Sequence, residues 1–356
     1  MKKLPLPAAL LAASLSLSVA PAALAETAPP VTPAPPTTPA PPAAPAPPVP
    51  VAGALKLSTP KVGGTPAFAL AGGRLVVHGL VTPYVSGQTL SVGFFRDGKQ
   101  YGSKTVTILP TGKGTGTFAL SFPSGKPGLV EARATHAAST LQAAFAARTK
   151  AVRFVTANLA PGSSGPSVRL LQSELSGMHF AVPLSGVFDE GTGRALIAYR
   201  KMTGQERIAY AGRKVFHLLE RHAGAFHVRY PHDGRHVEGD LTKQVLAEIE
   251  PGGKVRRLYT MSSGKPSTPT VIGRFNVYMR TPGVNSEGMV DSSYFIRGYA
   301  IHGYAEVPTY AASHGCLRVP VPDALSIYDW VRQGMPVDVY NEDGAGSSRV
   351  RSDAGP

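Results

Sequence analysis

The sequence has a single cysteine, Cys316, within the run Ser313-His314-Gly315-Cys316-Leu317-Arg318. A second histidine, His302, lies upstream in Ile301-His302-Gly303-Tyr304. A thiol with a pKa near 8.5 is mostly protonated at neutral pH, so a nucleophilic cysteine needs a nearby imidazole or backbone dipoles that favour the thiolate. Cys316 with its neighbouring histidines therefore predicts nucleophilic chemistry at sulfur.

Two histidines are candidates for the base. His314 is only two residues from Cys316 along an extended chain, whereas His302 comes from the end of a separate strand and can face the sulfur, which makes His302 the better candidate. Gly315 permits a tight turn, so the N–H groups of Gly315 and Cys316 are candidates for an oxyanion hole. No Asp or Asn is close in sequence to His302, so the group that orients it is left open, with the Gly303 carbonyl as one possibility.

The alternative interpretation makes Cys316 a buried, inert residue, as many free cysteines are. Exported proteins usually have cysteines in pairs, and a lone one in a Ser-His-Gly-Cys turn is hard to explain by packing. Papain-like peptidases place the cysteine before the histidine, the reverse of the order in this chain. Catalysis by Cys316 is thus the favoured hypothesis.

The N-terminus is typical of export. Met1-Lys2-Lys3 precedes an apolar run to about Val19 and a small-x-small site at Ala23-Leu24-Ala25, which predicts a signal peptide over residues 1–25. A membrane anchor is the alternative, but the run is short and carries Pro5 and Pro7. No later stretch is apolar for long enough to span a bilayer, so no membrane span is expected after cleavage, and the protein is expected in a periplasm, in a cell wall or secreted.

The chain is basic, with 36 Lys and Arg against 22 Asp and Glu and a formal charge of +14. Nucleic acid is the usual first partner to consider for such a charge, but export argues against it. An anionic wall or membrane surface is a more natural partner, and a merely solvated basic surface fits the scattered charges equally well.

Composition and periodicity divide the 356 residues into several parts, mainly β. Residues 26–54 form a linker rich in Pro and Ala, which favours extended polyproline II. Residues 55–157 show short alternating runs that predict an Ig-like β-sandwich with no evident site, and Asp97-Gly98 predicts a hairpin turn. The strands are expected at 74–81, 89–95, 104–109, 115–122 and 129–135.

Residues 160–222 change to a helical period. Val168, Leu171 and Leu175 share one helix face, and Ala195, Leu196 and Tyr199 belong to a second helix. The runs 165–172 and 185–189, followed by Thr192, resemble the peptidoglycan-binding domain type 1, a short helical bundle, and this resemblance implies binding to the wall. A helical linker without a ligand is the alternative.

Five histidines follow closely, and such tracts can bind metal. Their spacing fits no closed zinc pattern, so no metal site is expected there. They are His217, His222, His227, His232 and His236.

Residues 230–340 form the C-terminal catalytic domain in this division, and residues 341–356 a disordered tail. Strands are expected at 244–250, 254–262, 273–278 and 294–301, with a hairpin turn at 251–253. A helix opens at Pro322, with Leu325, Tyr328 and Val331 on its apolar face, and Trp330 is expected in the core.

This domain is similar to the catalytic domain of the L,D-transpeptidases (YkuD-type). The motif residues are His302-Gly303, Ser313-His314-Gly315-Cys316 and Leu317-Arg318. Ser263-Gly264-Lys265, Thr268-Pro269-Thr270 and Gly273-Arg274-Phe275 match an earlier strand and turn of the family.

The resemblance implies a β-rich fold and a reaction on peptidoglycan. Cys316 would attack the carbonyl after the third residue of a tetrapeptide stem, expel the terminal D-alanine and form a thioester. His302 would accept the thiol proton and later deprotonate the amine of a second stem. Ser313, His314 and Gly315 would shape the pocket, and Arg318 would either hold a stem carboxylate or brace the loop.

The expected partners are therefore peptidoglycan stem peptides and glycan strands, and no metal or organic cofactor is required. The same thioester serves two other reactions, hydrolysis by an L,D-carboxypeptidase and attachment of a protein to the wall. A wall-binding protein without catalysis is the alternative from another class.

Overall fold

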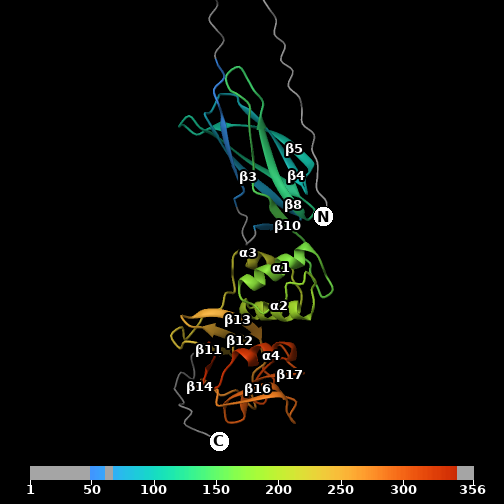
Figure 1. The fold of residues 1–356 in the computed structure, drawn as a ribbon. Helices are drawn as coiled ribbons and strands as arrows, with labels where there is room; N and C mark the ends of the chain where they lie inside the picture. Colours follow the sequence, from blue (N-terminus) through green and yellow to red (C-terminus); the bar gives the residue numbers. More distant parts are fainter. Residues whose placement is uncertain (1–48, 61–66, 343–356) are drawn as a thin grey trace, which may run out of the picture. The chain divides into compact units, whose positions relative to one another are not determined.

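The computed structural model describes residues 49–60 and 67–342, and Figure 1 shows how their helices and strands are arranged. The predicted signal peptide, most of the predicted linker and nearly all of the predicted tail lie outside these residues. The described part is rich in β-structure, as predicted. No helix in it is long and apolar enough to cross a membrane.

The N-terminal sheets form a sandwich in which four of the five expected runs match β3, β4, β7 and β8, whereas the run expected at 104–109 is divided between β5 and β6. One sheet has the order β1-β3-β7-β6, and the other has the order β2-β10-β8-β4-β5 with β9 paired to β8. Asp97 and Gly98 have positive φ angles at the hairpin between β4 and β5, as this dipeptide predicts. The strands are β1 (Ala54–Ser58), β2 (Phe68–Leu70), β3 (Gly73–Thr82), β4 (Thr89–Arg96), β5 (Lys99–Thr107), β6 (Leu109–Pro110), β7 (Gly116–Ser124), β8 (Gly128–His136), β9 (Phe145–Arg148) and β10 (Val152–Val155).

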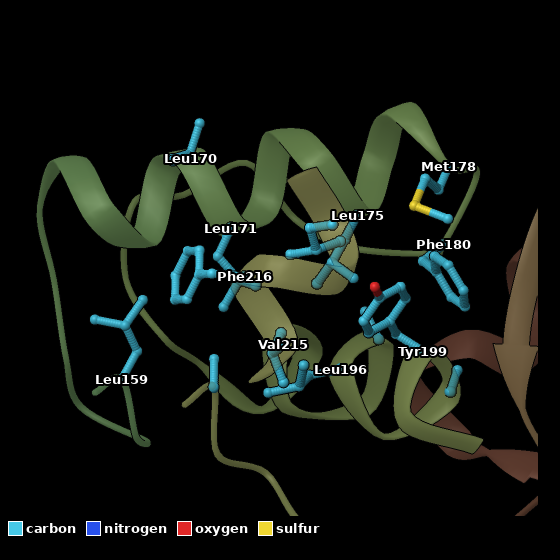
Figure 2. Close-up of a cluster of buried hydrophobic side chains, with 14 of the residues drawn as sticks. Leu159, Leu170, Leu171, Leu175, Met178, Phe180, Leu196, Tyr199, Val215 and Phe216 are labelled. Carbon is cyan, nitrogen blue, oxygen red and sulfur yellow. The ribbon is translucent and has the colours of Figure 1, made fainter. Parts of the chain in front are cut away.

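Three helices follow: α1 (Pro166–Gly177), α2 (Glu190–Met202) and α3 (Arg213–Glu220). Asp189 caps α2, because its carboxylate accepts a hydrogen bond from the Thr192 N–H. Figure 2 shows Leu171, Leu175, Leu196, Tyr199 and Phe216 converging on one interior, while Leu170 points away from them.

The core of these helices does not end at the helical segment. Val245, Ala247, Ile249 and Leu258 belong to the same buried cluster, although they lie on strands of the C-terminal domain. Phe180 connects the two parts, since it pairs with Leu258 and packs edge-on against Tyr199. The helical segment and the first C-terminal strands therefore share one core.

The C-terminal domain has two sheets and one helix. One sheet has the order β13-β12-β11-β19-β14, and the other has the order β15-β16-β17-β18. The elements are β11 (His236–Asp240), β12 (Val245–Glu250), β13 (Lys254–Thr260), β14 (Gly273–Asn276), β15 (Met279–Val284), β16 (Val290–Ile296), β17 (Tyr299–Tyr304), β18 (Leu317–Pro320), α4 (Val321–Trp330) and β19 (Pro336–Tyr340).

Two expectations for this domain are wrong. The strand predicted at 294–301 is a hairpin, because Arg297 adopts a left-handed conformation with φ 47° and turns β16 back into β17. Helix α4 buries Ala324, Ile327 and Trp330, whereas Leu325 is 58% exposed and Tyr328 is half-buried; of the predicted apolar positions only Val331, which directly follows the helix, is fully buried. Trp330 is in the core, as expected.

Candidate functional site

The candidate site forms on a pair of parallel strands. In the register of β17 and β18, Ile301 lies opposite Leu317 and His302 opposite Arg318. Ile301 and Leu317 are buried in the core beneath α4, and successive side chains of a strand point to opposite faces. His302, Arg318 and Cys316, which is two residues before Arg318, therefore lie on the face away from that core.

His302 is held as a neutral imidazole. Its side chain is buried at 2% exposure, and its Nδ1 lies 2.9 Å from the Gly303 carbonyl oxygen. A carbonyl can only accept, so Nδ1 carries the hydrogen and Nε2 is left with a free lone pair. Burial lowers the pKa of His302, and the charge of Arg318 lowers it further, against the opposing effect of the Gly303 hydrogen bond. The Gly303 carbonyl thus occupies the orienting position that the sequence left open.

Cys316 is held as a neutral thiol. Its Sγ lies 3.6 Å from the Gly298 carbonyl oxygen, and within the described ranges no hydrogen bond joins this sulfur to the His302 ring. Burial raises the pKa of Cys316, while a hydrogen bond from the Ala300 backbone and the charge of Arg318 lower it. A thiol with a raised pKa and an imidazole with a lowered pKa favour general-base activation over a preformed ion pair.

The turn before Cys316 is held by Ser313. The buried Ser313 Oγ donates to the Cys316 carbonyl at 2.7 Å and accepts from the Gly315 N–H at 3.0 Å. The Gly315 N–H is therefore already paired with Ser313, and its place in an oxyanion hole stays a prediction. Outside the strand ladders, the hydrogen bonds of the described residues include none from the Cys316 N–H, which remains the candidate donor.

Gly315 is required at its position for two reasons. Its φ of +124° is one that other residues rarely adopt, and a Cβ there would lie 1.7 Å from Cε1 of Tyr299. The Tyr299 ring thus covers the turn directly. The sequence predicted the need for glycine at position 315. It did not predict that the Tyr299 ring leaves no room for a larger residue there.

His314 has a different environment from His302. It is exposed, and its Nε2 lies 3.2 Å from the Nζ of Lys265. The backbone N–H of Lys265 donates to the Ser313 carbonyl, so His314 and Lys265 lie together beside the turn. His302 remains the candidate base.

Arg318 stacks on an aromatic ring. Its guanidinium carbon lies 3.9 Å from the centroid of the Tyr304 ring, and that ring packs edge-on against His302. No carboxylate of the described chain pairs with Arg318. Arg318 therefore keeps its charge available beside the site. Tyr304 was missed from the sequence, although its position two residues after His302 on a strand was a usable signal.

A second segment, Ser262-Ser263, braces the turn that carries Cys316. Ser262 and Arg318 exchange both backbone hydrogen bonds, and the Ser262 Oγ donates to the Tyr310 carbonyl. The Ser263 carbonyl accepts from the N–H groups of Ala312 and Ser313. Ser263 was recognised only as part of a matching motif, and its bracing role depends on pairings that are distant in sequence.

The helical segment reaches the same region through three cations. The buried Lys201 Nζ donates to the Gln244 carbonyl, the Thr260 hydroxyl and the Met261 carbonyl at 2.7 to 2.9 Å. Arg207 donates to the Thr309 carbonyl, and Arg194 pairs with Asp323 at 3.1 Å. Met261 and Thr309 directly precede Ser262 and Tyr310. The contacts of Lys201 and Arg207 therefore support the brace, by which we mean the backbone and side-chain hydrogen bonds that join Ser262 and Ser263 to residues 310–318.

The five histidines of the tract do not gather at one place with other ligand side chains. Among the described residues, no group of three or more His, Cys, Asp and Glu side chains is placed to hold a metal ion. His236 is fully buried, with Nδ1 2.8 Å from the Gly234 carbonyl and Nε2 3.2 Å from Glu238. It belongs to the polar interior of the sheet.

Residues 234–339 match the family model of the YkuD L,D-transpeptidase catalytic domain. The chain is 32% identical to an L,D-transpeptidase of Xylanimonas cellulosilytica, with 52% of this chain and 98% of that one covered and a TM-score of 0.49. It is 21% identical to an L,D-transpeptidase of Stackebrandtia nassauensis, with 53% and 98% covered and a TM-score of 0.35. No curated protein sequence matches.

Proposed function

Because the chain belongs to the L,D-transpeptidase family, we propose that it joins peptidoglycan stem peptides through a thioester formed on Cys316. The observation that carries this proposal is the register of β17 and β18, which puts Cys316, His302 and Arg318 on one face. The exposure of Cys316 fits the same role, since its side chain is partly open to solvent.

In the first half of the reaction, His302 Nε2 takes the proton of the Cys316 thiol as Sγ attacks the carbonyl of the third stem residue. The Cys316 N–H donates to the oxygen that becomes negative, and the charge of Arg318 stabilises both the sulfur and that oxygen. The bond to D-alanine breaks, and the imidazolium returns the proton to the departing amine.

In the second half, the amine of another stem attacks the thioester. His302 removes a proton from that amine, the C–S bond breaks, and the thiolate regains a proton, so a peptide bond links two stems and the free enzyme returns. The Gly303 carbonyl holds the imidazole in the required tautomer throughout.

Two further parts of the proposal rest on the sequence. The leader-like residues 1–25 support export to a periplasm or cell wall, where the substrate lies. The helical segment resembles a peptidoglycan-binding domain, and we propose that it contacts the wall polymer. The thiol chemistry itself needs neither a metal nor an organic cofactor.

Mass spectrometry of products tests the proposal. Wild type and Cys316→Ala are incubated with disaccharide-tetrapeptide, and a cross-linked dimer lacking one D-alanine is expected with wild type alone. A trimmed tripeptide as the sole product would replace transpeptidation by L,D-carboxypeptidase activity. The absence of both products with folded wild type would contradict the proposal.

A further inference from the structure

A groove of about 710 Å³ lies between helix α2 and the segment that follows His302. This volume is within the range of ordinary small-molecule sites. From the helical segment it is lined by Gly193, Ile197 and Ala209, and from the catalytic domain by Tyr304, Val307 and Thr309. The walls are therefore mostly apolar, with the tyrosine ring at the end nearest the site.

The groove continues the catalytic face. Tyr304 is on the same strand face as His302, two residues further on, and Pro320 opposite it also lines the groove. Cys316 is four residues before Pro320 along the chain, which at about 3.3 Å per residue is about 13 Å. The groove thus begins about 13 Å from the nucleophile, on the face that carries it.

The walls of the groove are held in place. Arg207 donates to the Thr309 carbonyl, so the catalytic-domain wall is fastened to the helical segment. Arg194, at the edge of the groove, pairs with Asp323 of α4. A groove with fixed walls can bind a ligand without a large ordering cost.

The lining of the groove includes an exposed apolar side chain and an aromatic ring. Val321 is 41% exposed, and Tyr304 contributes its ring. Apolar groups exposed around a recess mark a binding surface, and tyrosine offers both a flat ring and a hydroxyl. Such a surface suits the C–H faces and polar edges of a sugar.

We propose that this groove binds the N-acetylated amino sugar that carries the donor stem peptide. This inference rests on the proposed function. Three extended residues span about 10 Å, so a stem whose third carbonyl lies at Cys316 brings its sugar end close to Tyr304. The helical segment and the catalytic domain together then form the binding site of one substrate.

The rate of thioester formation on Cys316 in the full chain tests this inference, with free tetrapeptide and disaccharide-tetrapeptide as substrates. Wild type is expected to prefer the glycosylated substrate by about tenfold in kcat/KM, equivalent to about 1.4 kcal/mol. Ile197→Glu and Ala209→Trp should reduce that preference toward one, because they place a charge or bulk where the sugar binds.

Leu184→Glu is the matched control, since Leu184 is 62% exposed on the helical segment and does not line the groove. It should keep the wild-type preference. Equal rates for the two substrates in wild type, or a preference unchanged in both groove variants, would overturn the sugar site while leaving the thioester chemistry intact. If neither substrate acylates wild type, the proposed function itself fails.

Discussion

The β-sandwich and the helical segment both precede the catalytic domain, but they bury their side chains in different ways. The sandwich has a hydrophobic cluster of its own, formed by residues between Leu75 and Phe154. The helical segment shares its cluster with β12 and β13 and sends Lys201 and Arg207 to the braces of the nucleophile turn. A shared core makes the helices part of the catalytic unit. Strands β2 and β10 of the sandwich add Phe68, Leu70 and Val155 to the same cluster, whereas the central core of the sandwich is separate from it.

Matched core truncations should show this difference most strongly. Leu196→Ala in α2 and Leu90→Ala in β4 remove the same atoms from sites that are 0% and 1% exposed. Each should lower the free energy of unfolding of its own core by about 2–5 kcal/mol. Thioester formation should fall about tenfold for Leu196→Ala alone, because loosening α2 displaces the brace. Equal rates of thioester formation in Leu196→Ala and Leu90→Ala would contradict the claim that the helices and the catalytic domain act as one unit.

Removal of the buried lysine should have a slightly smaller effect. Burial lowers the pKa of Lys201 to about 7, and Lys201→Met leaves two carbonyls and a hydroxyl without their donor. We expect a loss of about 3 kcal/mol of stability and faster hydrogen exchange at residues 260–263. Lys104→Met, at an exposed position of β5, should change stability by less than about 0.5 kcal/mol. If hydrogen exchange at residues 260–263 is the same in Lys201→Met as in wild type, Lys201 does not stabilise the brace.

The contact between Arg207 and Thr309 should affect rate more than stability. Arg207→Gln removes a charged donor from the Thr309 carbonyl, which directly precedes Tyr310. We expect kcat for thioester formation to fall while the melting temperature changes little. Arg133→Gln in the sandwich, where Arg133 pairs with the nearby Glu131 and stacks on the Phe95 ring, serves as the control. A fall of the same size in both variants would mean that the contact does not position the site.

The smallest expected effect is on pH dependence. The base must be neutral, so activity should be lost as pH falls through the pKa of His302, which lies below its ordinary value because of burial and the charge of Arg318. Arg318→Gln removes that charge, so the acidic limb of kcat/KM should move to higher pH. Arg133→Gln should leave it in place. A limb that does not move, or moves to lower pH, would contradict the electrostatic role of Arg318.

Much of the site could be predicted from local sequence. Cys316, His302 and Gly315 are recognisable because their chemistry and backbone requirements are local. The pairing of the Gly315 N–H with Ser313 Oγ was not predicted, since it depends on the turn geometry. The hairpin within residues 294–301 was missed because Arg297 adopts a conformation that glycine usually takes. Lys201 and Arg207 could not be assigned, since their acceptors are tens of residues or more away in sequence.

Intact-protein mass spectrometry of the full chain with a tetrapeptide stem shows whether Cys316 forms the thioester. We expect one adduct with the mass of the stem less D-alanine, located by peptide mapping at Cys316, absent from Cys316→Ala and formed more slowly by His302→Gln. An adduct on another residue, or trimming of the stem by Cys316→Ala, would contradict it.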